Sequence, residues 1–320
     1  MTKRYKYLFG GLLLACLFTL SGCSHEMSIG GSEDDPGQPV ALRLQIGTES
    51  GASALPLTKA SRDMKAKDHE FINSLVVLIT NTDNRIEKVV PFEFTSEQME
   101  EMAEGKLESC ISDEFILTTG TKIIYAFANC EGLLFDDVLK ATSGTQLQLP
   151  LTVTWDKGQE WIPNDNKGFI PMTAKKEGTI GRNTKEVSIE LVRLLSRLEV
   201  SFCNSTDADI EILSWSIGMF NQKINLFGGE AIPNVGNDSN WNISDNTEKT
   251  VSASSAIEAV SYYVSESAMA GGFSVDINRG TGTETKYTSR TEIPRNHIWP
   301  LEILFSDYQL KIQIKGENPP

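Results

Sequence analysis

Side chains that commonly carry out catalysis or bind metals are sparse in this sequence of 320 residues. Only 3 residues are histidine, so a multi-histidine catalytic or metal centre is not expected. The neighbouring carboxylates Glu100 and Glu101 have the composition of an acid–base pair, but a solvated charged surface explains them better. The segment Asn164–Gly168 is similar to the start of a calcium loop, yet position twelve of such a loop falls on Lys175 instead of Glu. We therefore predict no enzyme activity, no metal and no cofactor.

One residue, Cys23, lies where a specific reaction is expected. Three basic residues occur among the first six, and Leu8–Leu20 is an apolar run too short to span a membrane. The run ends in Leu-Ser-Gly-Cys, which resembles a bacterial lipobox. In that motif a peptidase cuts between Gly22 and Cys23, and the cysteine thiol then takes a diacylglycerol. We predict a signal peptide over residues 1–22, with a plain signal peptide and an incidental cysteine as the alternative.

The charge balance limits the partners that this chain can have. Asp and Glu number 43 against 29 Lys and Arg, which gives a net charge of −14. Such an acidic chain repels phosphate backbones, so nucleic-acid binding is not expected. Residues 23–38 are rich in Gly, Ser, Pro and acidic side chains, and we interpret them as a flexible tether that follows the lipid. The acidic stretch is similar to a surface-export signal of Bacteroidota lipoproteins, and a simple linker is the equal alternative.

The remaining sequence indicates strands. Large apolar side chains alternate through Val40, Leu42, Leu44 and Ile46, which is typical of a half-buried strand. Residues 47–70 follow as a long polar loop. The other expected strands lie at 72–80, 86–94, 115–117, 122–129, 147–155, 185–192, 195–203, 210–217, 223–227, 259–264, 273–277, 286–291, 299–305 and 309–314. The pairs 72–80 with 86–94 and 115–117 with 122–129 are expected to form hairpins, and 228–246 is expected to be a loop.

Only one helix is expected, and the cysteines are few. A capping box at Thr95–Gln98 predicts a short helix that ends near Glu104. Many short strands favour an all-β fold with two tandem β-sandwich domains, at 39–195 and 196–320. The cysteines that follow Cys23 are Cys110, Cys130 and Cys203. They show no zinc spacing, and one disulfide among them is possible in an oxidising envelope.

Five local patterns, in order, resemble the fimbrillin family, which comprises the lipoprotein pilins of type V pili in Bacteroidota. The first is the strand Val40–Ile46 followed by a basic loop that contains Arg62. The others resemble family patterns at strand ends and turns, and we interpret them as framework residues without a catalytic role. They are Gly120–Asn129, Phe169–Ala174 with Ile189–Arg193, Tyr262–Glu266, and Ile293–His297 with the strand Leu301–Phe305.

The resemblance implies a fold and a mechanism. Members of the family have two transthyretin-like β-sandwiches, and an arginine-specific protease cuts the loop after the first strand. Arg62 is the candidate cleavage site here. The exchanged strand would carry Val40, Leu42, Leu44 and Ile46, and a strand from the next subunit would replace it. The implied partners are other pilin subunits, the outer membrane through the lipid anchor, and a possible host or bacterial surface ligand.

One departure from the family bears on the role within a pilus. Stalk subunits carry a C-terminal donor extension, whereas only the short segment 306–320, ending Pro319-Pro320, follows Phe305. We therefore expect a tip or minor fimbrial subunit at the cell surface, and a pilus anchor subunit is an alternative. A second alternative is a glycan-binding surface lipoprotein that does not polymerise. Its stacking platform would come from the tryptophans Trp155, Trp161, Trp215, Trp241 and Trp299, although core packing is the better interpretation of each.

Overall fold

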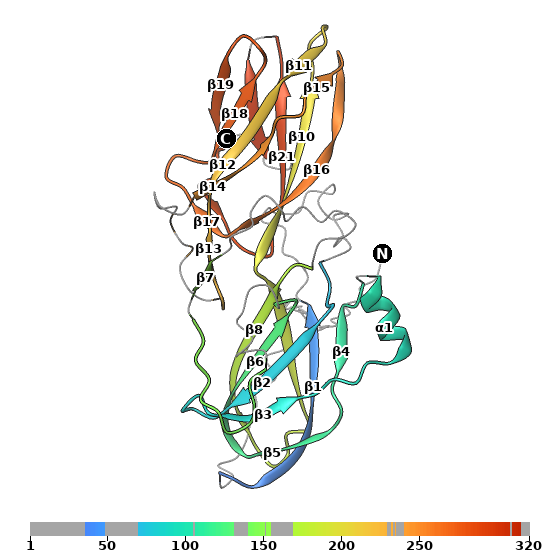
Figure 1. Cartoon of the computed structure of the whole chain (residues 1–320), viewed down its shortest axis with the longest axis vertical. Coiled ribbons are helices and arrows are strands. Elements are labelled where there is room, and N and C mark those ends of the chain that lie inside the picture. The colour runs from blue at the N-terminus through green and yellow to red at the C-terminus, as the bar shows by residue number, and fades with distance from the viewer. Residues whose placement is uncertain are drawn as a thin grey trace, which may run out of the picture.

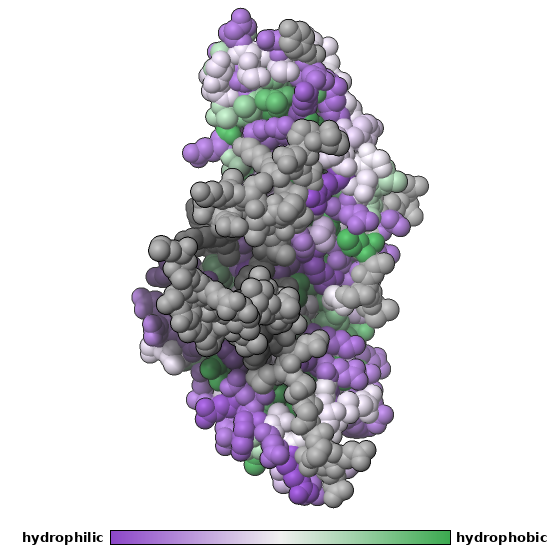
Figure 2. Space-filling model, turned by 180° about the vertical axis from the view of Figure 1, so that it is seen from behind, coloured by the Kyte–Doolittle hydropathy of each residue, from purple (hydrophilic) through white to green (hydrophobic). Residues whose placement is uncertain are grey.

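The computed structural model describes residues 36–48, 70–104, 106–130, 140–150, 152–154, 169–228, 232, 234, 240–307 and 309–314. The described chain is mostly strand and forms two β-sandwiches stacked along the long axis of the molecule (Figure 1). Hydrophilic residues predominate on the face shown in Figure 2, where hydrophobic residues occur in small patches. No helix in the described part of the chain is long and apolar enough to cross a membrane. The all-β fold with one short helix that the sequence predicts is therefore confirmed.

The first sandwich contains an eight-stranded sheet that folds over on itself. Its strands are β1 (Pro39–Thr48), β2 (Leu75–Thr80), β3 (Ile86–Val90), β4 (Ser109–Ile111), β5 (Phe115–Thr118), β6 (Gly120–Ala128), β8 (Met172–Ile180) and β9 (Glu186–Arg193). The order is β3-β2-β6-β8-β9-β1-β4, and β5 pairs with the first half of β1. Strands β8 and β9 pair only at Met172–Thr173 with Val192–Arg193, so the sheet turns there and encloses one core.

Local chemistry explains the connections within this sandwich. Strands β2 and β3 form the predicted hairpin, and its turn contains Asn84 at a φ of 58°, a conformation that asparagine tolerates. The helix α1 (Ser96–Ala103) begins at Thr95, whose hydroxyl accepts from the Gln98 amide, while the Gln98 side chain accepts from the Thr95 amide. This is the capping box that the sequence predicts. Helix α1 lies beside β4 at the side of the sandwich (Figure 1).

The second sandwich has two four-stranded sheets, with orders β16-β10-β21-β22 and β14-β12-β18-β19. Its strands are β10 (Leu195–Asn204), β11 (Ile210–Ile212), β12 (Ser214–Asn221), β13 (Lys223–Asn225), β14 (Asn240–Asp245), β15 (Lys249–Val251), β16 (Ser255–Ser265), β17 (Ser267–Ala268), β18 (Ser274–Asn278), β19 (Thr283–Tyr287), β20 (Glu292–Ile293), β21 (Ile298–Phe305) and β22 (Leu310–Ile314). Small pairs β11–β15 and β17–β20 complete it. Trp215, Trp241 and Trp299 are buried in its core.

Several details of the predicted strands are wrong. Strands β5 and β6 do not form a hairpin, because β5 crosses to β1 while β6 pairs with β2 and β8. The chain changes direction at Gly120, which adopts a φ of 115°. Glycine takes this conformation readily because it has no Cβ atom. The expected strand 147–155 is reduced to β7 (Thr152–Thr154), and 210–217 divides into β11 and β12. The expected loop 228–246 contains β14, because Trp241 and Ile243 are needed to fill the second core.

Candidate functional site

The strand that the sequence singles out, β1, is held on both sides. It runs parallel to β9 through residues 43–48 and antiparallel to β5 and β4 on its other side. The alternating side chains Val40, Leu42, Leu44 and Ile46 all enter the core, with exposed fractions of 7%, 1%, 0% and 0%. Between them, Arg43 and Gln45 face outward. The predicted alternation of β1 is therefore confirmed, and the strand fills an apolar groove, called here the β1 groove.

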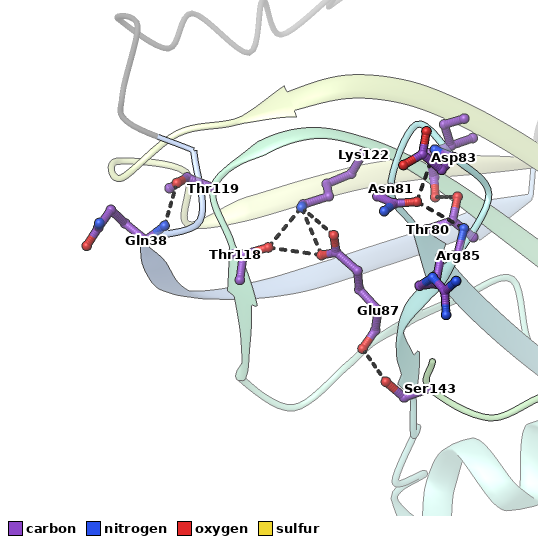
Figure 3. A network of polar contacts seen from close by, with 11 residues as sticks. Gln38, Thr80, Asn81, Asp83, Arg85, Glu87, Thr118, Thr119, Lys122 and Ser143 are labelled. Atoms are coloured by element: carbon purple, nitrogen blue, oxygen red, sulfur yellow. Dashed lines mark hydrogen bonds and ion pairs between the residues drawn. The ribbon is translucent and has the colours of Figure 1, made fainter. Parts of the chain in front are cut away.

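Main-chain hydrogen bonds extend over the whole length of the β1 groove. The Arg43 amide donates to the Lys185 carbonyl at 3.0 Å, and the Thr48 amide donates to the Glu108 carbonyl at 3.0 Å. At the other end, the Gln38 amide donates to the Thr119 hydroxyl at 3.0 Å (Figure 3). The Thr119 amide donates back to the Gln38 carbonyl at 2.8 Å. Strand β1 is thus held both by its buried side chains and by its main-chain hydrogen bonds.

A buried lysine ties the β5 wall of the groove to the rest of the sandwich (Figure 3). Lys122 on β6 is only 4% exposed, and its ammonium lies 2.8 Å from the Glu87 carboxylate of β3. The same ammonium donates to the Thr118 hydroxyl at 2.9 Å, and Thr118 donates to Glu87 at 3.0 Å. Strand β5 is therefore held by contacts that do not involve β1.

The thiol of Cys110 belongs to β4, the strand beside β1 in the sheet. Cys110 pairs with Ile46 across β1 and β4, and it is 3% exposed. Burial raises the pKa of the Cys110 thiol to about 12. Cys110, Cys130 and Cys203 are all free, so the disulfide that the sequence left open does not occur in this structure. The buried state of Cys110 makes it a natural reporter of whether β1 is in place.

Three residues quoted for the family resemblance, Arg193, Tyr263 and Asn296, come together with Glu70 and Arg197 where the two sandwiches meet. Arg193, at the end of β9, donates from Nε to the Glu70 carbonyl at 2.8 Å and from Nη1 to the Asn296 side chain at 3.2 Å. The Glu70 carboxylate accepts hydrogen bonds from Arg197 Nη1 at 2.6 Å and from the Tyr263 hydroxyl at 2.6 Å. These five residues are each no more than 9% exposed. They form a buried polar cluster, called here the junction cluster.

The electrostatics of the junction cluster follow from burial and from Glu70. Burial raises the pKa of Tyr263, and the charge and hydrogen bond of Glu70 raise it further. Burial lowers the pKa of Arg193, although the charge of Glu70 opposes this. For Arg197 burial also lowers the pKa, but the charges of Glu70 and Glu199 outweigh it, and the net shift is upward. The guanidinium of Arg197 is thus paired with two carboxylates, while that of Arg193 donates to the Glu70 carbonyl.

Further framework contacts surround the junction cluster. Asn129 is 8% exposed, and its side-chain amide donates to the carbonyls of Phe71 at 2.8 Å and Ile170 at 3.0 Å. Arg295 donates from Nε to Glu266 at 3.1 Å. The short strands β7 and β13 pair across the two halves, and one apolar core includes side chains from both. Residues from four of the quoted motifs, among them Asn129, Arg193, Tyr263 and Arg295, thus contribute to the junction, whereas the motif of β1 lies in the first core.

Comparisons with known proteins agree with this geometry. No protein-family model matches the sequence, and no curated protein is detectably similar to it. Among solved structures, the tip fimbrial protein of Porphyromonas gingivalis, with a C-terminal truncation, has a TM-score of 0.55 at 10% identity, covering 86% of this chain and 98% of that one. A candidate cell adhesion protein of Parabacteroides distasonis has a TM-score of 0.51 at 15% identity, covering 86% and 90%. A candidate cell adhesion protein of Bacteroides eggerthii has a TM-score of 0.50 at 11% identity, covering 89% and 97%.

The chain shares the fold of these proteins. Because both sandwiches are covered in each match, the likeness includes their arrangement in one chain. The fold that the family resemblance implies is therefore supported by structures as well as by short motifs.

Other predicted site residues lie outside the described part of the chain. These are Gly22 and Cys23, at the signal-peptide boundary, and Arg62, in the segment between β1 and Glu70. Trp155 and Trp161 are also outside it, and the three described tryptophans are buried and form no exposed stacking platform. Within the described residues, no group of three or more His, Cys, Asp or Glu side chains could hold a metal ion.

Sequence reasoning did not identify Glu70, Lys122 or Ser112, which contacts Leu44 of β1. Glu70 and Lys122 have no local pattern that would mark a buried charge. In the structure the alternation of buried side chains slips by one residue between Cys110 and Phe115, but the sequence does not show this slip, because the exposed Ile111 is also apolar. Such a slip is typical of a β-bulge.

Proposed function

We propose that this chain is a non-enzymatic, lipid-anchored subunit of a type V fimbrium, a tip or minor subunit that acts in cell adhesion. The observation that carries the proposal is β1, a strand next to the chain's only predicted cleavage loop that buries four alternating side chains in a continuous groove. The shared fold with a tip fimbrial protein and with candidate cell adhesion proteins supports it. Its partners would be other pilin subunits and a ligand on a host or bacterial surface.

The proposed assembly step is strand exchange after proteolysis. Cleavage at Arg62 would separate β1 from the chain that continues at Glu70, so that β1 could leave. A strand from a neighbouring subunit would then enter the β1 groove. Burying four such side chains contributes roughly 1.5–3 kcal/mol each, an upper estimate from area. An empty groove would also leave two sheet edges unpaired, which favours strand addition.

The proposed position in the fimbrium agrees with how the last described strand is used. Strand β22 pairs with β21 along its whole length, and Leu310 and Ile314 are buried in the second core. Strand β22 is thus part of its own sandwich and is not a free donor strand. In the proposed assembly, the subunit therefore accepts a strand from a neighbour in its β1 groove.

Anchoring is the proposed role of Cys23. Export with cleavage after Gly22 would expose the cysteine for lipid attachment, and residues 23–38 would connect the lipid to the first sandwich. The mature protein would then lie at the cell surface, on the outer membrane or in the fimbrium. This part of the proposal depends on the lipobox alone.

An arginine-specific protease tests the proposal. Treatment of the wild-type protein should give a fragment that begins at Asp63, and the cut protein should join a fimbrial stalk subunit and cap its chains. Arg62→Ala should stop both events, whereas the matched control Lys67→Ala should leave them unchanged, because the protease does not recognise lysine. Polymerisation of the cut protein by itself would contradict the tip role. Failure of the cut protein to join any pilin subunit would overturn strand exchange.

A further inference from the structure

The ladder between β1 and its antiparallel neighbours contains one irregularity. Leu42 pairs with Phe115 of β5, and Gln45 pairs with Ile111 of β4. Two residues of β1 therefore lie opposite the three residues 112–114, which defines a β-bulge. At a bulge the regular exchange of main-chain hydrogen bonds is interrupted, so the Leu44 amide of β1 has no main-chain acceptor in the ladder and needs another one.

A side chain supplies the missing acceptor. The Ser112 amide donates to the Leu44 carbonyl at 2.9 Å, and the Ser112 hydroxyl accepts from the Leu44 amide at 2.9 Å. The same hydroxyl donates to the Asp113 carbonyl at 2.9 Å, which directs its lone pairs toward β1. Ser112 is 4% exposed and Leu44 is 0% exposed, so water cannot replace this contact.

We propose that Ser112 is a specificity-determining residue of the β1 groove. Its hydroxyl accepts a hydrogen bond from one main-chain amide of whichever strand occupies the groove. The proposal rests on strand exchange as the function of the groove. Ser112 touches β1 through main-chain atoms, so it would accept any side chain that fits the Leu44 pocket. It would reject proline there, because proline has no amide to donate. The occupant would therefore be an extended strand with a large apolar, non-proline residue at that position.

The proline of β1 itself shows where the groove tolerates a missing amide. Pro39 pairs with Thr118, next to a pair in which the Thr119 amide donates to the Gln38 carbonyl. In an antiparallel ladder such neighbours alternate, so Pro39 belongs to a pair that exchanges no main-chain hydrogen bonds. The parallel ladder with β9 begins only at Arg43. Pro39 therefore removes no hydrogen bond from the ladder. A proline in place of Leu44 would have no amide hydrogen, so the Ser112 hydroxyl oxygen would lose the donor that it accepts from.

A double-mutant cycle tests this role. The protein is the full chain, cut within residues 49–69 and then separated from its β1 fragment, and the probe is a synthetic peptide of residues 36–48 whose direct binding to this protein is measured. A second peptide carries an ester in place of the Leu44 amide, which removes the N–H and keeps the size. For the amide peptide, Ser112→Ala should weaken binding by about 5-fold to about 150-fold, the effect of leaving a buried donor unpaired. For the ester peptide, the same substitution should change binding by less than about 2-fold.

Two controls separate this role from a general loss of structure. An ester at Arg43 removes a bond to Lys185, the residue before β9, so its effect and that of Ser112→Ala should add. Ser112→Thr keeps a hydroxyl and should restore binding of the amide peptide. Equal effects of Ser112→Ala on the amide and Leu44-ester peptides would overturn the role of Ser112, while strand exchange would stand. Failure of the cut wild-type protein to bind the amide peptide would overturn both.

Discussion

Replacing Leu44 by alanine should loosen β1 in the cut protein far more than replacing its exposed neighbour Arg43. The Leu44 side chain is 0% exposed, and removing such a side chain from a core costs about 2–5 kcal/mol. Once the covalent link in residues 49–69 is cut, this cost acts directly on the release of β1. The open population should rise by about 30-fold to about 4000-fold, since 1.4 kcal/mol is a factor of ten. Arg43→Ala keeps the same main chain and removes no core contact.

The thiol of Cys110 provides the assay. In the closed protein it is buried on β4 beside β1, and burial raises its pKa to about 12 from 9.0, so the reactive thiolate is scarce at pH 8. Release of β1 should expose the thiol and return its pKa toward the ordinary value, and both changes speed alkylation. Alkylation is followed by mass spectrometry of the Cys110 peptide, which separates it from Cys130 and Cys203. Equal labelling of Cys110 in the cut Leu44→Ala and Arg43→Ala proteins would refute the idea that β1 covers an exchangeable groove.

Three further outcomes follow from the lipobox and the junction cluster. Cys23→Ala should move the protein from the membrane fraction to the soluble fraction and abolish palmitate labelling; a variant that stays membrane-bound would contradict lipid anchoring. Glu70→Gln should lower the free energy of unfolding by up to about 3–5 kcal/mol, because it removes one of the two carboxylates that pair with the buried Arg197 and leaves only Glu199. The exposed control Glu104→Gln should change it by less than about 0.5 kcal/mol in denaturant titrations. The raised pKa of Tyr263 means that its contribution to stability is complete below pH 10 and is lost as the pH rises further, by up to about 1.4 kcal/mol per pH unit. Tyr263→Phe should therefore give a shallower loss of stability above pH 10, and an unchanged slope would contradict this.

Features decided by neighbouring residues could be predicted from the sequence. The alternation of Val40 to Ile46 gave β1 because side chains on one face of a strand recur every second residue. The capping box at Thr95 gave α1 because its two hydrogen bonds involve residues three apart. In both cases the deciding contacts are short-range, so no knowledge of the rest of the fold was needed.

Features decided by partners distant in sequence were not predicted. Strand β5 looked like half of a hairpin with β6, yet its hydrogen bonds go to β1, whose residues lie about 77 positions earlier by the register of Val40 with Leu117. Glu70 is one charged residue among many near the 47–70 segment, and only the arrival of Arg197 and Tyr263 makes it part of a buried cluster. Several of the family motifs meet at the junction cluster, and this meeting could not be foreseen, because it joins residues about 100 positions apart such as Arg193 and Asn296.

The residues that hold the two sandwiches together differ from those that β1 covers. The four core side chains of β1 belong to the core of the first sandwich, and none of them belongs to the apolar core shared by both halves. Glu70 joins the junction cluster from the chain that follows the predicted cleavage site, so a cut at Arg62 would leave this connection intact. Lys122 likewise fixes β5 without help from β1. Loss of β1 would therefore open one groove while both its β5 wall and the second sandwich stay in position, which is what a subunit needs if it is to accept a strand from a neighbour and remain folded.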